Sequence, residues 1–276
     1  MEDKNLTNTA TSVQGGILNK IVEHKRIEVA EAKSRISRSA LEKSEYFGRT
    51  CYSLPEFMLD EARTGIIAEF KRASPSKGVI NDQAEVSLVT RQYAEAGASA
   101  LSVLTDQKFF GGKIRDLIEA REANQIPILR KDFIIDEYQI VEAKAIGADI
   151  ILLIASILSP REVAGFAKLA KTLGLNVLLE VHNREELENN IFDDLDAIGV
   201  NNRNLDNFTV SVQHSHDLVN LIPDRFLKIS ESGISDPNTI TELRAAGFNG
   251  FLIGENFMKG SDPGRAIQSF VNELRK

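Results

Sequence analysis

The chain has 276 residues, of which 42% are hydrophobic and 26% are charged, and its formal net charge is −7. These values exclude a disordered chain and a small disulfide-dependent scaffold, and the acidic balance argues against a nucleic-acid-binding surface. The single cysteine, Cys51, cannot form an internal disulfide. The first residues contain no apolar stretch of the signal-peptide kind, and the longest apolar run, residues 150–155, is too short to span a membrane. We therefore expect a cytoplasmic protein that binds neither nucleic acid nor membrane.

Residues 17–33 form a charged amphipathic pattern that predicts a helix. From residue 66 onward, short apolar runs alternate with amphipathic helical patterns, at a spacing of roughly 26 residues. The predicted strands are 66–70, 100–105, 127–131, 150–154, 177–181, 197–200, 226–230 and 250–253. The predicted helices that follow them are 84–96, 114–124, 136–146, 160–173, 184–190, 212–221, 237–246 and 263–274.

Eight consecutive β/α units favour a closed (β/α)8 barrel, the TIM barrel fold, because right-handed crossovers bury both faces of a parallel sheet and closure removes its edges. An open doubly wound sheet is the alternative, but the glycine-rich first turn typical of nucleotide-binding sheets is missing. We therefore expect two parts: an N-terminal helical extension at residues 1–64 that packs on the barrel, and a catalytic barrel at residues 65–276.

Charged residues follow several of the predicted strands. Glu69 and Lys71 end the first strand on the same side, since strand side chains alternate with a period of two. Lys131 ends the third strand and Glu180 ends the fifth. Burying each of these charges inside a dry barrel would cost about several kcal/mol of folding free energy unless the charge is paired. The carboxyl ends of the strands carry the active site in TIM barrels, so we interpret these residues as functional.

The last two strands run into glycine-containing loops. Ser232 and Gly233 follow the seventh strand, and Gly254 and Glu255 follow the eighth. Glycines let backbone amides approach a ligand, and a short helix that opens near Glu255 would aim its first amides at an anion. Because the corresponding loops of TIM barrels often bind phosphate, the sequence predicts a phosphorylated ligand here.

Six segments in chain order resemble the indole-3-glycerol-phosphate synthase family: EFKRASPSKG at 69–78, SVLTD at 102–106 with FFGG at 109–112, LRKDF at 129–133, LEVH at 179–182, GVNNRNL at 199–205 and ESGI at 231–234. The helix at 18–30 is similar to that family's extra N-terminal element. The resemblance spans all eight β/α units.

The resemblance implies a carboxy-lyase of tryptophan biosynthesis that needs no cofactor, and the sequence itself contains no cluster of residues that would require a metal. Its substrate would be 1-(2-carboxyphenylamino)-1-deoxyribulose 5-phosphate, which closes to indole-3-glycerol phosphate with loss of carbon dioxide and water. By similarity, Lys131 is the general acid at the ketone and Glu180 acts in dehydration, while Glu69 and Lys71 share in proton transfer or, for Lys71, in holding phosphate.

The resemblance also assigns the binding residues. Asn201 and Arg203 would hold the benzoate carboxylate, for which a guanidinium has the matching geometry. The apolar slot for the aromatic ring would be formed by Phe110, Phe133 and Leu205. The phosphate side would be lined by Ser74, Ser232, Gly233, Gly254 and, through its backbone amide, Glu255.

Two alternatives differ in what they require. Phosphoribosylanthranilate isomerase is a phosphate-binding barrel of the same pathway, but it needs a cysteine base, and Cys51 precedes the first strand. A non-catalytic binder of phosphorylated ligands would not need four ionisable groups at the strand ends. Association with other tryptophan-pathway enzymes is a further expectation from the resemblance.

Overall fold

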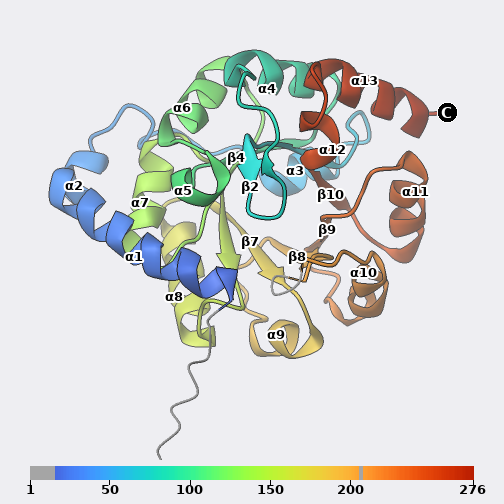
Figure 1. Cartoon of the computed structure of the whole chain (residues 1–276). Coiled ribbons are helices and arrows are strands. Elements are labelled where there is room, and N and C mark those ends of the chain that lie inside the picture. The colour runs from blue at the N-terminus through green and yellow to red at the C-terminus, as the bar shows by residue number, and fades with distance from the viewer. Residues whose placement is uncertain (1–15, 205–207) are drawn as a thin grey trace, which may run out of the picture.

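The computed structural model describes residues 16–204 and 208–276 and contains a closed barrel of eight parallel strands surrounded by helices (Figure 1). The strands pair in the order β1-β10-β9-β8-β7-β6-β5-β4. Their bounds are β1 (Ile66–Phe70), β4 (Ala100–Leu104), β5 (Ile128–Lys131), β6 (Ile150–Ile154), β7 (Asn176–Val181), β8 (Ala197–Asn201), β9 (Leu227–Glu231) and β10 (Gly250–Ile253). The predicted TIM barrel is confirmed, and each predicted strand lies within one residue of an observed one at both ends.

Each barrel strand is followed by a helix of the outer layer. These helices are α4 (Val86–Glu95), α6 (Ile114–Ala123), α7 (Glu137–Ala145), α8 (Pro160–Thr172), α9 (Arg184–Asn189), α10 (Gln213–Leu218), α11 (Pro237–Ala246) and α13 (Pro263–Leu274). Serine, aspartate or asparagine side chains cap most of their N-termini, as at Ser159, where a full capping box opens α8. The predicted helix 212–221 is divided into α10 and a 3-10 turn at Val219–Leu221.

The sequence pattern does not predict several short elements in the segment before β1 and in the loops. They are α2 (Arg38–Leu41), α3 (Leu54–Met58), α5 (Gln107–Phe110) and the hairpin of β2 (Ala73–Ser74) with β3 (Gly78–Val79). Helix α12 (Glu255–Met258) begins at the residue where a short helix was expected. Elements of two to five residues carry too few periods of the hydrophobic pattern to stand out from a loop.

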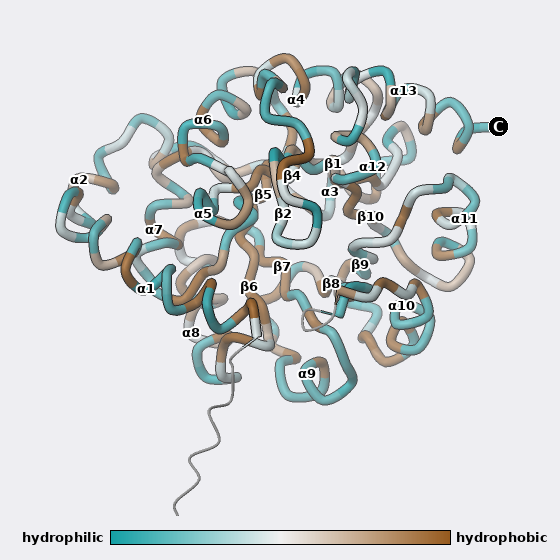
Figure 2. Tube along the Cα trace, in the orientation of Figure 1, coloured by the Kyte–Doolittle hydropathy of each residue, from teal (hydrophilic) through white to brown (hydrophobic). Residues whose placement is uncertain are grey.

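Apolar side chains pack on both sides of the barrel wall. One cluster lies between the strands and the outer helices, and another, which includes Ile67, Leu129, Leu178 and Ile229, lies inside the barrel. Figure 2 shows mainly hydrophobic residues on the strands, whereas hydrophobic and hydrophilic residues alternate along the outer helices. The inward-facing residues of the strands are therefore apolar toward the amino-terminal end of the barrel. The last inward-facing position of each strand is left for the site.

The segment before β1 contacts both ends of the barrel. Helix α1 (Ile17–Arg35) lies at the carboxyl-terminal end of the strands, where Ile17, Leu18 and Ile21 line the same pocket as strand-end residues. Helix α3 lies at the other end, where Leu54 and Met58 join the apolar cluster inside the barrel. The segment thus runs from the carboxyl-terminal end of the barrel to its amino-terminal end.

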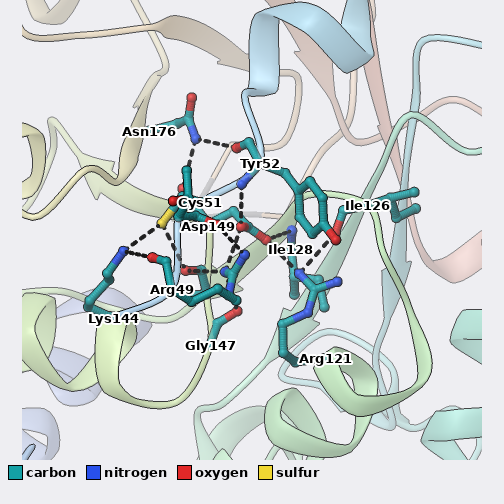
Figure 3. A network of polar contacts seen from close by, with 12 residues as sticks. Arg49, Cys51, Tyr52, Arg121, Ile126, Ile128, Lys144, Gly147, Asp149 and Asn176 are labelled. Atoms are coloured by element: carbon teal, nitrogen blue, oxygen red, sulfur yellow. Dashed lines mark hydrogen bonds and ion pairs between the residues drawn. The ribbon is translucent and has the colours of Figure 1, made fainter. Parts of the chain in front are cut away.

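A network of polar contacts closes the amino-terminal end of the barrel (Figure 3). At its centre is Asp149, which is fully buried and precedes β6. One carboxylate oxygen accepts from Arg49 Nη2 at 2.6 Å and from the Tyr52 amide at 2.8 Å. The other oxygen accepts from Arg121 Nη1 at 2.8 Å and from the Ile128 amide at 2.9 Å. This carboxylate joins the N-terminal segment to the barrel.

Candidate active site

Two adjoining pockets open over the carboxyl ends of the strands, and eight residues line both of them. The shared residues are Glu69, Lys71, Ser76, Arg203, Phe208, Ser232, Leu252 and Glu255. One pocket continues toward α1 and is lined by apolar groups such as Ile21 and Phe110. The other continues toward the loops after β9 and β10, where glycines and lysines gather. The site therefore has an aromatic end and a polar, cationic end.

Lys131 lies at the centre of the site between two carboxylates. Its Nζ is 2.7 Å from Glu231 Oε2 and 3.1 Å from Glu180 Oε2. Asn201 donates a hydrogen bond to the other Glu180 oxygen at 3.0 Å, and His182 Nε2 lies 3.4 Å from that oxygen. Three neighbouring strands, β7, β8 and β9, thus direct polar side chains toward a lysine from β5.

The protonation states in this cluster follow from burial and from the neighbouring charges. Burial opposes the ammonium form of Lys131, but the carboxylates of Glu231 and Glu180 outweigh it and raise the lysine pKa. Burial opposes the anionic form of Glu180, but Lys131, His182 and the Asn201 amide lower its pKa. In contrast, burial and the charges of Glu180 and Glu69 exceed the attraction of Lys131 and raise the pKa of Glu231 to about 7. Glu231 therefore titrates near neutral pH.

Glu69 and Lys71 form a second ion pair beside this cluster, with Nζ 2.7 Å from Glu69 Oε1. The pair confirms that Glu69 of β1 and Lys71, which directly follows the strand, point to the same side, as the period of two predicts. Ser102 Oγ donates to the other Glu69 oxygen at 3.4 Å.

Two glycines make room for buried carboxylates because they have no side chain. A Cβ at Gly199 would lie 2.1 Å from Glu231 Oε1, and a Cβ at Gly254 would lie 2.5 Å from Glu69 Oε1. Any larger residue would collide with the carboxylates, so both glycines serve close packing here.

The aromatic end is built from α5, β5 and α1. The Phe110 and Phe133 ring centroids are 5.9 Å apart and tilted by 36°. Both rings line the pocket together with Leu18 and Ile21 of α1. Phe109 instead packs edge-on against His24, at 6.0 Å. Of the two adjacent phenylalanines that could cover a ligand, the structure thus directs Phe110 to the pocket and Phe109 to α1.

Arg203 lies between the two ends of the site. Its backbone N–H donates to Asn201 Oδ1 at 3.0 Å, which ties the loop after β8 to the cluster around Lys131. Its guanidinium is 3.7 Å from Glu255 Oε2, and Lys77 Nζ is 3.7 Å from the other oxygen of Glu255. Both contacts are longer than a hydrogen bond.

The polar end combines positive charge with turning backbone. Ser232 and Gly233 have φ values of 68° and 78°, so the chain turns sharply after β9. A left-handed serine is strained, and such strain is concentrated at functional sites. Gly254 precedes α12, and Lys71, Lys77 and Lys259 line the same pocket. Ser74 lies nearby on β2, with its hydroxyl 3.4 Å from that of Ser76.

The structure thus brings the predicted site residues together, apart from Leu205, which lies outside the described residues. Glu231 and the α1 residues Leu18 and Ile21 were missed. Counting by two along the seventh strand from Ile229 would have placed Glu231 inside the barrel. In the described ranges 16–204 and 208–276, His, Cys, Asp and Glu form no group that could hold a metal ion, and no helix there is long and apolar enough to cross a membrane.

A TIM barrel with paired acids and bases at its strand ends, beside a cationic glycine-lined pocket, defines an enzyme for phosphorylated small molecules. Residues 18–270 match the family model "Indole-3-glycerol phosphate synthase". The chain belongs to this family, whose members are carboxy-lyases of tryptophan biosynthesis.

Curated relatives are similar over nearly their whole length. The indole-3-glycerol phosphate synthase of Bacteroides thetaiotaomicron is 47% identical over 94% of this chain and 99% of its own. The protein of the same name from Lachnoclostridium phytofermentans is 43% identical over 94% of this chain and 100% of its own. A third, from Burkholderia ambifaria, is 43% identical over 91% and 97%, respectively.

Solved structures of low sequence identity share the fold. A chain of the tryptophan synthase complex from Pyrococcus furiosus superposes with a TM-score of 0.56 at 16% identity, covering 77% of this chain and 98% of that one. A lactate oxidase from Pediococcus acidilactici gives a TM-score of 0.60 at 17% identity, covering 77% of this chain and 69% of that one. These similarities concern the barrel alone.

Proposed function

We propose that the site closes 1-(2-carboxyphenylamino)-1-deoxyribulose 5-phosphate to indole-3-glycerol phosphate, with Lys131, Glu180, Glu69 and Lys71 as its catalytic groups. The observation that carries the proposal is the lysine held 2.7 Å and 3.1 Å from two carboxylates, between an aromatic pocket and a cationic one. The substrate has a matching order of parts: an aromatic acid, a ketone and a phosphate.

Binding would use the two ends of the site separately. The benzoate ring would lie between Phe110 and Phe133, with Leu205 as a third apolar contact, and its carboxylate would pair with Arg203 and Asn201. The phosphate would bind at the polar end, where its partners would be Ser74, Ser232, Gly233, Gly254 and the backbone amide of Glu255. The ketone would then lie over the lysine and carboxylate cluster.

Lys131 would start the reaction by giving its proton to the ketone oxygen. The ring carbon that carries the carboxylate attacks the ketone carbon, and the new hydroxyl takes the ammonium proton. The bond to the carboxylate then breaks, its electron pair returns to the ring, and carbon dioxide leaves. Ammonium stabilisation of the developing oxyanion is strongest in a site that excludes water.

Dehydration would complete the indole ring. A proton from an acid lets the hydroxyl leave as water, and Glu180 accepts the proton from the adjacent carbon, so that the ring double bond forms. Lys71, whose Nζ is 2.7 Å from Glu69, would supply this acid. Glu231 extends this set, because its raised pKa suits it to exchange a proton with Lys131 between steps.

Formation of the indole product, followed by ultraviolet absorbance, tests this function. We expect the purified chain to convert the ribulose phosphate substrate and to leave the isomerase substrate unchanged. Cys51 supports this distinction, because its Sγ lies 3.7 Å from the Ala148 carbonyl at the opposite end of the barrel from the site. Tight binding of the substrate without an absorbance change would indicate the non-catalytic alternative.

The setting of the enzyme is also a proposal. We place it in the cytoplasm, since it acts in amino-acid biosynthesis and carries a single cysteine. We assign catalysis to the barrel at residues 65–276 and an accessory, site-completing role to residues 1–64. Association with other enzymes of the pathway is testable by cosedimentation with purified partners, where an unchanged sedimentation coefficient would argue against it.

A further inference from the structure

A lysine of α1 is buried beneath the helix, where its charge has no access to solvent. Lys25 is 3% exposed, although α1 is a charged helix on the surface of the barrel (Figure 1). It lies one turn after Ile21, on the face that lines the substrate pocket. Burying an ammonium is costly unless it is paired with carboxylates, so the position requires an explanation.

Lys25 joins the ends of two neighbouring strands. Its Nζ lies 2.9 Å from Asp106 Oδ2, just after β4, and 2.9 Å from Asp132 Oδ1, just after β5. Glu28 of α1 completes the set at 2.5 Å. Both aspartates are buried, at 0% and 3% exposed. A single ammonium from the N-terminal helix thus bridges two carboxylates of the barrel.

Each aspartate is directly connected to a group of the site. Asp106 caps α5 by accepting from the Phe109 amide at 2.9 Å, and α5 ends with Phe110. Asp132 follows Lys131, and its carboxylate also accepts from the Phe133 amide at 2.8 Å. The orientation of Lys131 and of both pocket rings therefore depends on how these two carboxylates are fixed.

Other contacts hold Asp132 from outside the barrel but do not reach α1. Thr105 Oγ1 donates to it at 2.6 Å, and Arg130 Nη2 lies 3.2 Å away while also pairing with Glu142 of α7 at 2.7 Å. Without Lys25, the single positive charge of Arg130 would face the two negative charges of Asp132 and Glu142. Asp106 would remain buried but would lose the ammonium that pairs with it. The lysine thus supplies both the charge balance and the link to the helix.

We propose that Lys25 is a positioning residue for catalysis, which fixes Lys131 and the Phe110–Phe133 pocket relative to the apolar face of α1. The inference rests on the proposed function, because it concerns the same pocket. It makes α1 a part of the active site and not only a cover for the barrel. The substrate part that depends on this arrangement is the aromatic acid, which would lie between the two rings and α1.

The same helix offers a matched control. Lys33 pairs with Asp136 at 2.6 Å, but the two side chains are 47% and 33% exposed, and Asp136 caps α7 away from the pocket. Lys25→Met and Lys33→Met thus remove the same charge from the same helix. We expect Lys25→Met to lower kcat between about tenfold and 100-fold and to raise KM, because small displacements of catalytic groups have effects of that size. We expect Lys33→Met to change neither constant by more than about twofold.

A charge-balanced double variant separates positioning from stability. Lys25→Met with Asp106→Asn removes one charge of each sign, and asparagine can still cap α5. We expect this variant to recover most of the thermal stability lost in Lys25→Met while kcat stays low. Recovery of kcat together with Tm would overturn the proposal, since Lys25 would then only balance buried charge.

Three further results complete the test. Wild-type kcat and KM in folded Lys25→Met would also overturn the inference, with the proposed function intact. If Lys25→Met does not fold, the double variant decides by the same criterion. A wild-type protein that forms no indole product would overturn the proposed function and this inference with it.

Discussion

Asp149 at the amino-terminal end of the barrel and Glu231 at the carboxyl-terminal end are equally buried, at 0% and 1% exposed. Each oxygen of Asp149 receives two hydrogen bonds (Figure 3). Glu231 has Lys131 at one oxygen, whereas its Oε1 accepts no hydrogen bond from any residue that the structure describes. One carboxylate is saturated by its partners, and the other is not.

The difference separates a structural use of buried charge from a functional one. A carboxylate whose oxygens all accept hydrogen bonds joins segments that are far apart in the chain, and it has no free acceptor for a ligand. Burial and the neighbouring charges of Glu180 and Glu69 raise the pKa of Glu231, so this carboxyl retains the capacity to exchange a proton. The predictions below test whether changes at the two ends affect stability and activity separately.

Lys131→Met should show the largest effect. We expect kcat to fall by about 100-fold to 10,000-fold with substrate affinity largely retained, because the ammonium would act in the transition state. Steady-state kinetics with the absorbance assay measure both constants, and Lys168→Met on the exposed face of α8 is the control. Retention of more than about a tenth of the activity, equivalent to under roughly 1.4 kcal/mol, would remove Lys131 from the acid role.

Glu180→Gln tests the second group of the same cluster. The substitution keeps the shape of the side chain and removes its charge, so we expect a fall in kcat similar to that of Lys131→Met. A rise in KM alone would make Glu180 a binding residue.

Asp149→Asn should lower the free energy of unfolding and leave kcat unchanged. The substitution leaves the buried Arg121 without its carboxylate, and we expect a loss of about 3 kcal/mol in the free energy of unfolding, as for other broken buried pairs. Urea denaturation measures this loss. The control Asp193→Asn breaks an exposed pair with Arg225 and should change stability by less than about 0.5 kcal/mol. A lowered kcat in the folded variant would contradict the separation of the two ends.

Arg203→Ala should weaken binding of the benzoate carboxylate. We expect a substrate analogue to lose about 2 kcal/mol of binding free energy, since its carboxylate would be left unpaired. An analogue without that carboxylate should bind wild type and variant equally, and Arg203→Lys should show an intermediate loss, because lysine lacks the bidentate fork. Equal losses for both analogues in a calorimetric titration would assign Arg203 a structural role.

The strands and the groups at their ends could be predicted because both depend on local pattern. Residues 66–70 are apolar except for Glu69, and the period of two alone places Glu69 on the same side as Lys71. The partners of a buried charge could not be predicted in the same way. Glu231 contacts Lys131 across 100 residues of chain, and Lys25 lies in a helix whose composition suggests exposure. Their environments depend on closure of the barrel and on the docking of α1, which no short segment encodes.

The smallest expected effect concerns the pH dependence of stability. A carboxyl whose pKa is about 7 in the folded state and near its usual value of 4.5 when unfolded binds its proton more tightly when folded. Its contribution therefore lowers stability as the pH rises from about 4.5 to about 7, and the loss is constant above that range. Between about pH 6 and about pH 8, wild type should lose about 1 kcal/mol more than Glu231→Gln, which cannot titrate. Urea denaturation at the two pH values measures the difference, whatever the substitution does to absolute stability. Equal slopes for the two proteins would mean that Glu231 is ionised throughout and satisfied like Asp149, and the contrast between the two ends of the barrel would then rest on geometry alone.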